Sequence, residues 1–247
     1  MVHLGLKWKD LFGEEEDEMS PEPDQADRQE DELASRSARF RAFLDALPPV
    51  TETTGGEVLR ERGLSVEMAN WYGYRVHERG IALPSRSEDG LTILGIQLRT
   101  GLPGHKYEWL KVEGVSPPYS ALYHVCQRSV GFLQQGFRLT EGVIKADVSA
   151  TLTPVPTVGI MGVSSWVNIL PLVRKVRPVW VSLAFDQDWK TNGGVRRARR
   201  DLARALNSER IDVFTESWPE EYNGIDDFLA SGRPVCEIER NSWSEGF

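Results

Sequence analysis

The sequence has few residues that could form covalent or metal cross-links. Its 247 residues include only two cysteines, Cys126 and Cys236, and four scattered histidines. Two cysteines cannot build a disulfide framework, and neither lies in a C-x-x-C pair. None of the histidines has the spacing of a structural zinc site. The sequence therefore excludes the disulfide-rich class and predicts a protein of a reducing compartment.

Long hydrophobic runs and targeting signals are also missing. No apolar run approaches the ~20 residues needed to span a bilayer. Residues 1–10 contain neither the apolar core nor the small-residue cleavage site of a signal peptide. We therefore expect a cytoplasmic protein with no membrane partner.

Acidic residues are abundant, but most of the excess lies at one end. Residues 10–32 hold twelve of the 37 acidic residues and only one of the 29 basic residues, so the remainder carries 25 acidic and 28 basic side chains. Dense like charge with proline cannot bury enough apolar area to order a chain. The sequence predicts a disordered acidic arm, which is either a solvating tail or an arm that binds partners. The near-neutral body could meet phosphate groups through local basic patches.

Turn residues and apolar periodicity divide the chain into four parts. These are residues 1–50 with the disordered arm and a short helix at 33–47, a small α+β domain at 56–132, an α/β domain at 134–237, and a tail at 238–247. Within the second part, Asp89-Gly90 between two apolar runs predicts a β-hairpin.

The region 134–237 alternates strands and helices. Apolar runs of strand length lie at 137–140, 157–161, 179–185 and 211–215, and segments of helical length at 142–152, 164–176 and 194–207. Such alternation predicts a parallel sheet with helices flanking both faces. The fold class is therefore α/β, preceded by the small α+β domain and the arm.

Carboxylates follow two strands of this sheet. Glu141 comes directly after the strand at 137–140, and Asp186 and Asp188 follow the strand at 179–185. Parallel sheets bind ligands at the carboxyl ends of their strands, and carboxylates gathered there suit Mg²⁺ or Mn²⁺. An Asp-x-Asp after a strand is by itself a weak signal, because loops and helix starts favour aspartate anyway.

Four motifs stand in order in this region. They are Glu141–Asp147, Val158–Trp166, Ala184–Asp188 and Gly224–Ala230. Together they resemble a TOPRIM-like family of primase-related proteins from phages, plasmids and other mobile elements, whose members carry a DUF3854-type domain. The resemblance covers most of residues 134–232. More loosely, Leu59–Leu64 and Lys106-Tyr107 resemble the segment that precedes the TOPRIM core in bacterial and phage primases.

The resemblance implies roles for the acidic residues. Glu141 matches the TOPRIM glutamate, a general acid or base, and Asp186 and Asp188 match the metal-binding Asp-x-Asp. It implies Mg²⁺- or Mn²⁺-dependent chemistry on DNA or RNA phosphodiesters, in the replication of a mobile element. The sequence departs from the family at Lys145, which takes the position of a further acid, and in the later position of the glycines after Asp188.

Basic and aromatic residues near the Asp-x-Asp are candidates for binding single-stranded DNA or RNA. They are Lys145, Trp189, Lys190, Arg196, Arg197 and Arg200. The arginines could follow a phosphate backbone, although a solvated helix face is the commoner explanation. Trp189 could stack on bases. Asp226 and Asp227 could add metal ligands, but we favour the interpretation that they cap a short helix.

Three functions remain open from the sequence. The favoured one is a primase-like enzyme that depends on Mg²⁺ or Mn²⁺. The second is a catalytically weak module that binds nucleic acid and recruits a helicase or a replication initiator. The third is a TOPRIM nuclease. Titration with a divalent metal separates the second from the other two, and product analysis separates synthesis from cleavage.

Overall fold

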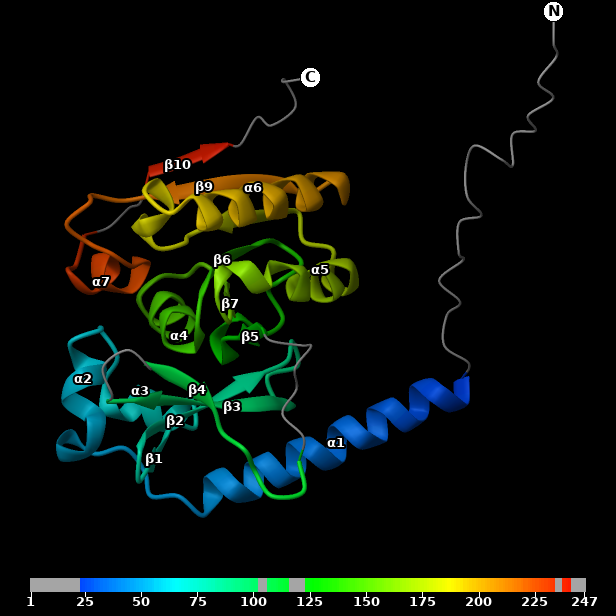
Figure 1. The fold of residues 1–247 in the computed structure, drawn as a ribbon, viewed down its shortest axis with the longest axis vertical. Coiled ribbons are helices and arrows are strands. Elements are labelled where there is room, and N and C mark those ends of the chain that lie inside the picture. The colour runs from blue at the N-terminus through cyan, green and yellow to red at the C-terminus, as the bar shows by residue number, and fades with distance from the viewer. Residues whose placement is uncertain (1–22, 102–105, 116–122, 234–236, 241–247) are drawn as a thin grey trace, which may run out of the picture.

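The computed structural model describes residues 23–101, 106–115, 123–233 and 237–240, with side chains from residue 27 onward except that of Asp188. The chain forms two sheets, one above the other in Figure 1, with helices between and around them. No helix in these ranges combines the length and apolar character that a membrane span needs. The predicted domain limits stay a prediction.

The first helix begins earlier than the sequence indicates. Helix α1 (Pro23–Asp45) contains residues 23–32, which we expected to be disordered, so this part of the prediction is wrong. Phe40 and Leu44 anchor the helix in an apolar cluster with strands of the first sheet. Extending an anchored helix costs less than starting one, so the exposed acidic turns continue it outward (Figure 1). Residues 10–22 of the expected arm lie outside the described residues.

The first sheet is antiparallel and has the order β1-β2-β3-β4. Its strands are β1 (Arg75–His77), β2 (Gly80–Arg86), β3 (Ile93–Thr100) and β4 (Tyr107–Trp109), preceded by the π-helical turn η2 (Glu52–Gly56), α2 (Glu57–Arg60) and α3 (Val66–Trp71). The predicted hairpin is confirmed between β2 and β3. In its turn Asp89 accepts the backbone amides of Leu91 and Thr92, and Gly90 has a φ of 68°.

The second sheet has the order β10-β9-β8-β6-β7-β5. Its strands are β5 (Tyr123–Val125), β6 (Phe137–Glu141), β7 (Thr157–Ile160), β8 (Trp180–Leu183), β9 (Asp212–Ser217) and β10 (Glu237–Arg240). Strands β6 to β9 pair in parallel, and the edge strands β5 and β10 pair antiparallel to them. The predicted α/β fold with a parallel sheet and flanking helices is confirmed.

Helices cover both faces of this second sheet. They are the 3₁₀ turns η3 (Gln127–Ser129), η4 (Val163–Ile169) and η5 (Gln187–Lys190), and the α-helices α4 (Val143–Leu152), α5 (Leu170–Val176), α6 (Gly193–Ser208) and α7 (Ile225–Ala230). On one face, α5 and α6 pack in the main core with the strands. On the other, α4 lies between the two sheets, and its apolar residues share a second core with α2, α3 and β2 (Figure 1).

A buried polar network fixes α4 against the first sheet. Both carboxylate oxygens of Asp147 are bonded: Oδ1 lies 3.0 Å from His124 Nε2, and Oδ2 accepts the Tyr74 hydroxyl at 2.7 Å. His124 Nδ1 accepts the backbone amide of Arg86, so Nε2 carries the proton and donates to Asp147. Each buried group therefore has a partner, as a stable interior requires. The network sets the position of α4, whose first turn enters the site described next.

Candidate functional site

The predicted acidic residues lie at the carboxyl edge of the parallel strands. Glu141 is the last residue of β6 and pairs with Ile160, the last residue of β7. Asp186 follows shortly after the end of β8, beside β6 in the sheet. Both side chains are half-buried. The backbone of Asp188 is in η5, and its side chain lies outside the description.

The turn from β6 into α4 depends on two glycines. Gly142 has a φ of 82°, in the left-handed region that favours glycine, and its amide donates to the Ile160 carbonyl at 2.7 Å. A Cβ on Gly159 would lie 2.4 Å from the Gly142 carbonyl oxygen. Helix α4 therefore starts directly against β7. This close packing brings Lys145, in its first turn, over the edge of the sheet.

Lys145 binds Asp186 across this edge. Its ammonium group donates to both carboxylate oxygens of Asp186, and the Asn223 amide donates to Oδ2 at 3.3 Å. Burial disfavours the charged amine, but the carboxylates of Asp186, Asp226 and Glu141 outweigh burial and raise the pKa of Lys145. The lysine is therefore a permanent positive charge among the acidic residues at neutral pH.

Asp226 forms a second buried ion pair beside the first. Its side chain is fully buried, and Oδ2 accepts Arg62 Nη1 at 2.7 Å. Burial raises the pKa of Asp226, while Lys145 and Arg62 oppose that rise. Burial also lowers the pKa of Arg62, but the Asp226 carboxylate, together with Tyr107 and Asp227, opposes burial, and the net pKa is raised. The other oxygen of Asp226, Oδ1, is buried without a hydrogen-bond partner among the described atoms.

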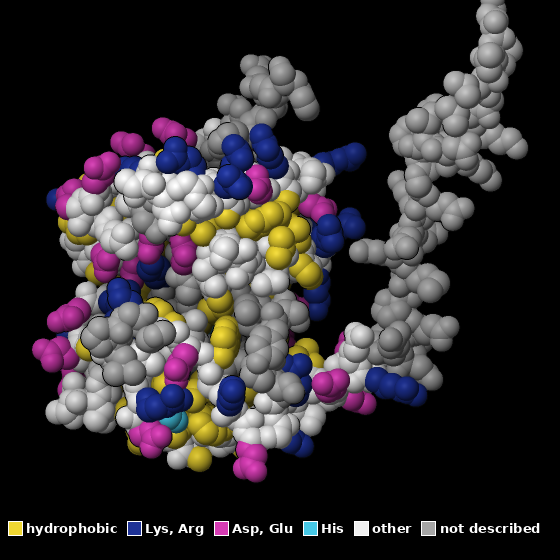
Figure 2. All heavy atoms as spheres, viewed as in Figure 1, with side chains coloured by type: hydrophobic (Ala, Val, Ile, Leu, Met, Phe, Trp, Pro, Cys, Tyr) yellow, Lys and Arg dark blue, Asp and Glu magenta, His cyan; other side chains and the backbone are white. Residues whose placement is uncertain are grey.

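A cavity of about 460 Å³ opens between the two sheets at this edge. Its lining from the first half of the chain is Arg62, Gln97, Lys106, Tyr107, Glu108 and Trp109, and its lining from the second half is Glu141, Gly142, Ile144, Lys145, Met161, Gly162, Asp186, Asn223 and Asp227. Figure 2 shows acidic and basic side chains side by side along the boundary between the two halves. The cavity is therefore polar and mixed in charge.

The other predicted nucleic-acid-binding residues lie around the start of α6. Lys190 pairs with Glu220 at 2.8 Å, and Arg196 donates to the carbonyl of Lys190 at 3.1 Å. Arg199 lies over the Trp189 ring, 4.2 Å from its centroid, so one face of that ring is covered. The exposed Arg197 and Arg200 lie farther along α6. Lys and Arg side chains gather along this side of the molecule in Figure 2.

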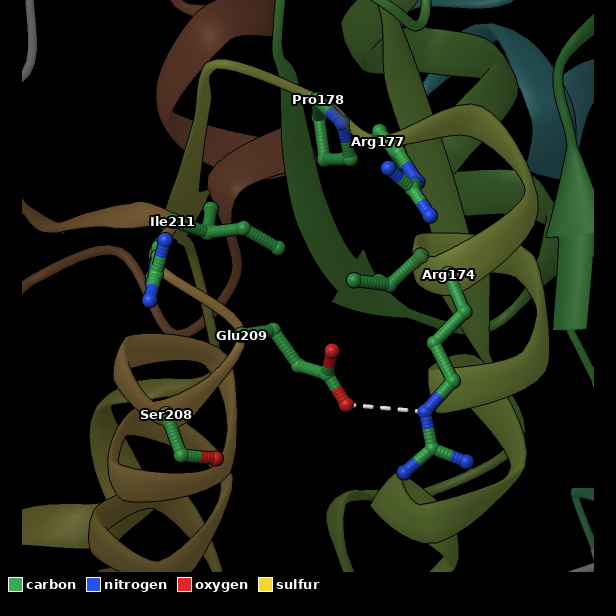
Figure 3. A pocket seen from close by; sticks show the side chains of 8 residues that line it. Arg174, Arg177, Pro178, Ser208, Glu209 and Ile211 are labelled. Carbon is green, nitrogen blue, oxygen red and sulfur yellow. Dashed lines mark hydrogen bonds and ion pairs between the residues drawn. The ribbon is translucent and has the colours of Figure 1, made fainter.

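Another group of arginines lines a cavity at the opposite edge of the second sheet. This cavity, of about 440 Å³, lies where α5 and α6 end and β8 and β9 begin. Arg174, Arg177 and Arg210 line it, and Arg174 donates to Glu209 at 2.8 Å (Figure 3). Cations are favoured at helix C-termini because carbonyl dipoles point there. The position of these arginines at helix C-termini is therefore enough to explain the cluster, and no ligand is needed.

Two residues of the candidate site were missed or misread in the sequence. Arg62 lies in the motif Leu59–Leu64, but nothing in its spacing indicates that it reaches the second sheet. Asp226 was interpreted as a helix cap. In the structure Gly224 occupies the cap position of α7, and the Asp226 side chain binds Arg62 instead. The sequence signals that point to these two residues are the motifs that contain them, Leu59–Leu64 and Gly224–Ala230.

Comparisons with known proteins give a family match for the second half of the chain. Residues 134–234 match the family described as a domain of unknown function, DUF3854. No curated protein matches the chain.

Solved structures extend the similarity to both sheets. The zinc-binding and RNA polymerase domains of the Aquifex aeolicus primase superpose with a TM-score of 0.61 at 13% identity, over 83% of this chain and 61% of that one. The DnaG primase catalytic domain bound to single-stranded DNA gives 0.57 at 15% identity, over 81% and 75%. The RNA polymerase domain of Mycobacterium tuberculosis DnaG with double-stranded DNA gives 0.58 at 15%, over 81% and 79%.

The extent of these matches limits what they show. This chain spans about three fifths of the Aquifex aeolicus chain. At identities this low, the similarity is one of fold. Residues 134–234 therefore match the DUF3854 family model, within a chain that has the fold of a primase catalytic core.

Proposed function

We propose that this chain is a primase-like protein that acts on single-stranded DNA or RNA in the cavity between its two sheets. One observation carries the proposal: the carboxyl edge of the parallel strands, with Glu141 and Asp186, opens onto that cavity in a chain with a primase catalytic-core fold. The resemblance of the motifs to TOPRIM-like proteins adds replication of a mobile element as the setting.

In this proposal the residues at the carboxyl edge of the parallel strands have different chemical roles. Glu141 takes or gives a proton, because a carboxylate at the cavity wall can reach a reacting hydroxyl. Asp186 and Asp188 are the residues that would hold Mg²⁺ or Mn²⁺. When bound, such an ion neutralises the charge that develops on phosphate. Arg62 and Lys106 bring positive charge to the cavity wall for the phosphate backbone.

The fit of the site to a divalent ion is mixed. Carboxylate oxygens are the ligands that Mg²⁺ and Mn²⁺ prefer, and the unpartnered Oδ1 of Asp226 is a buried acceptor at the same place. Within the ranges that the structure covers, however, no three His, Cys, Asp or Glu side chains form a group that could hold a metal. The ammonium group of Lys145 already binds Asp186.

The experiment for the proposed function is an activity assay on a single-stranded template with ribonucleotides and Mg²⁺ or Mn²⁺. Primer synthesis supports the primase-like proposal, whereas strand cutting identifies a nuclease. If the protein binds the template but forms no product with either metal, it acts as a binding module. Absence of both binding and product would overturn the proposal.

The binding module that recruits a helicase or replication initiator is the second candidate. The Lys145–Asp186 ion pair favours it, because a lysine neutralises one of the carboxylates on which metal-dependent chemistry depends. In this alternative the cavity and the basic side of α6 hold nucleic acid, and the partner protein supplies the chemistry. Both candidates require binding of single-stranded nucleic acid.

The basic side of α6 leads to a prediction about this binding. The triple variant Arg196→Gln, Arg197→Gln, Arg200→Gln should bind single-stranded DNA about 10- to 100-fold more weakly at low salt. Each lost phosphate contact also removes about 0.7 from the slope of log affinity against log salt, so the slope should become shallower by roughly 2. Fluorescence anisotropy across a salt series measures both quantities.

The opposite edge of the sheet supplies a matched control. Changing Arg174, Arg177 and Arg210 to glutamine removes the same charge from the far cavity shown in Figure 3. This control should keep most of the affinity and the slope, because its residues lie away from the proposed path. Equal losses in the two triple variants would show that only net charge matters, and would contradict a nucleic-acid path along α6.

A further inference from the structure

Three charged side chains converge at the start of α7. They crowd position 224, where a Cβ would lie 2.3 Å from Asp226 Oδ1, 3.1 Å from Lys145 Cε and 3.5 Å from Asp186 Oδ1. Asp186, which follows β8, and Asp226, in the first turn of α7, therefore approach one point. The Lys145 side chain lies between them.

Lys145 forms hydrogen bonds with only some of the carboxylate oxygens that meet here. Its ammonium binds both oxygens of Asp186, and Arg62 binds one oxygen of Asp226. The Oδ1 of Asp226 remains buried without a hydrogen-bond partner among the described atoms. A buried carboxylate oxygen without a partner is costly. The geometry is therefore that of a cation site in which one acceptor is still open.

We propose that the Lys145 ammonium is a resident cation that competes with a divalent metal ion for Asp186 and Asp226. An ammonium and a metal ion that bind the same carboxylate repel each other, so each weakens the binding of the other. The flexible stem of lysine lets its ammonium leave when an anion offers another partner. In this account the chain binds a divalent ion weakly until Lys145 moves. This inference rests on the proposed function only for the assignment of Asp186 as a metal ligand.

The test compares Mn²⁺ binding to the full chain in the parent and in Lys145→Gln, by isothermal titration calorimetry and by the thermal shift that Mn²⁺ produces. Glutamine keeps most of the length but removes the charge. We expect Lys145→Gln to bind Mn²⁺ at least tenfold more tightly than the parent. Its melting temperature should also rise more with Mn²⁺, since an ion that binds only the native state stabilises it.

Further variants separate the proposed site from other effects. Lys145→Arg keeps the charge and should stay as weak as the parent, and Lys145→Gln with Asp186→Asn should lose the gained affinity. Lys175→Gln is the control for charge, because Lys175 pairs with Glu88 away from the site. It should leave Mn²⁺ binding unchanged.

Two results would overturn the competition: equal Mn²⁺ affinity in the parent and Lys145→Gln, or no Mn²⁺ binding by either. Neither result decides the proposed function, because that function is tested by a separate assay, the binding of single-stranded DNA without metal. If the parent fails to bind DNA while Lys145→Gln gains Mn²⁺ affinity, the proposed function fails and the competition stands.

Discussion

Glu141→Gln should reduce the rate of product formation on a single-stranded template by roughly 10²- to 10⁴-fold, the usual contribution of a general acid or base. The amide keeps the shape of the side chain but cannot accept a proton at neutral pH. Glu141 is half-buried at the end of β6 and lines the cavity, so the substitution should change little of the fold. Initial rates with Mg²⁺ or Mn²⁺ measure the effect.

The same variant should keep its affinity for single-stranded DNA within about threefold, because other residues provide the phosphate contacts. Glu221→Gln serves as the control, since Glu221 is exposed and pairs with Arg233 on the surface. A Glu141→Gln protein that retains the parent rate would show that Glu141 does not transfer the proton, and would leave only a role in binding.

Arg138→Met should lower the free energy of unfolding by about 3–5 kcal/mol. Arg138 of β6 and Glu216 of β9 are both buried, and the guanidinium donates to both carboxylate oxygens at 2.8–3.0 Å. Ser182 of β8 also donates to Glu216 at 2.5 Å, so the pair crosses three neighbouring strands. Methionine would fill the space but leave the carboxylate buried without its partner. Urea denaturation gives the difference.

The double variant Arg138→Met, Glu216→Leu distinguishes the pair from ordinary packing. When both charges are replaced by apolar side chains of similar size, the cost of burying them disappears with their attraction. The double variant should therefore recover most of the lost stability and come within about 1–2 kcal/mol of the parent. If it is less stable than either single variant, the two residues stabilise the sheet independently, and the account of the ion pair is wrong.

Most of the second sheet could be predicted because its strands are buried on both faces. The runs at 137–140, 179–185 and 211–215 are rich in apolar residues, as strands covered by helices on two sides require, although Arg138, Ser182 and Asp212 interrupt them. The edge strands β5 and β10 were not predicted. They are short, and β10 is exposed along its whole length, so no apolar pattern indicates it.

The position of the acidic residues at the carboxyl edge of the sheet could also be predicted, because it follows from where the buried strands end. The ion pairs that these residues form could not be predicted. Strand ends place Glu141 and Asp186 at one edge of any parallel sheet. The binding of Lys145 to Asp186 instead depends on how α4 packs against β7, and the binding of Arg62 to Asp226 depends on contact between the two halves. Such contacts between distant residues leave no local signal in a single sequence.

Hydrogen exchange with and without single-stranded DNA tests the central claim that nucleic acid occupies the cavity between the sheets. Strand β4 is at an edge of its sheet, and the first amides of α4 have no partner within the helix, so both should exchange rapidly in the free protein. We predict that DNA slows exchange at residues 106–109 and 143–145 and leaves residues 174–178 and 208–211 unchanged. Protection confined to the second pair of segments, or no protection at the first despite saturating DNA, would contradict the account.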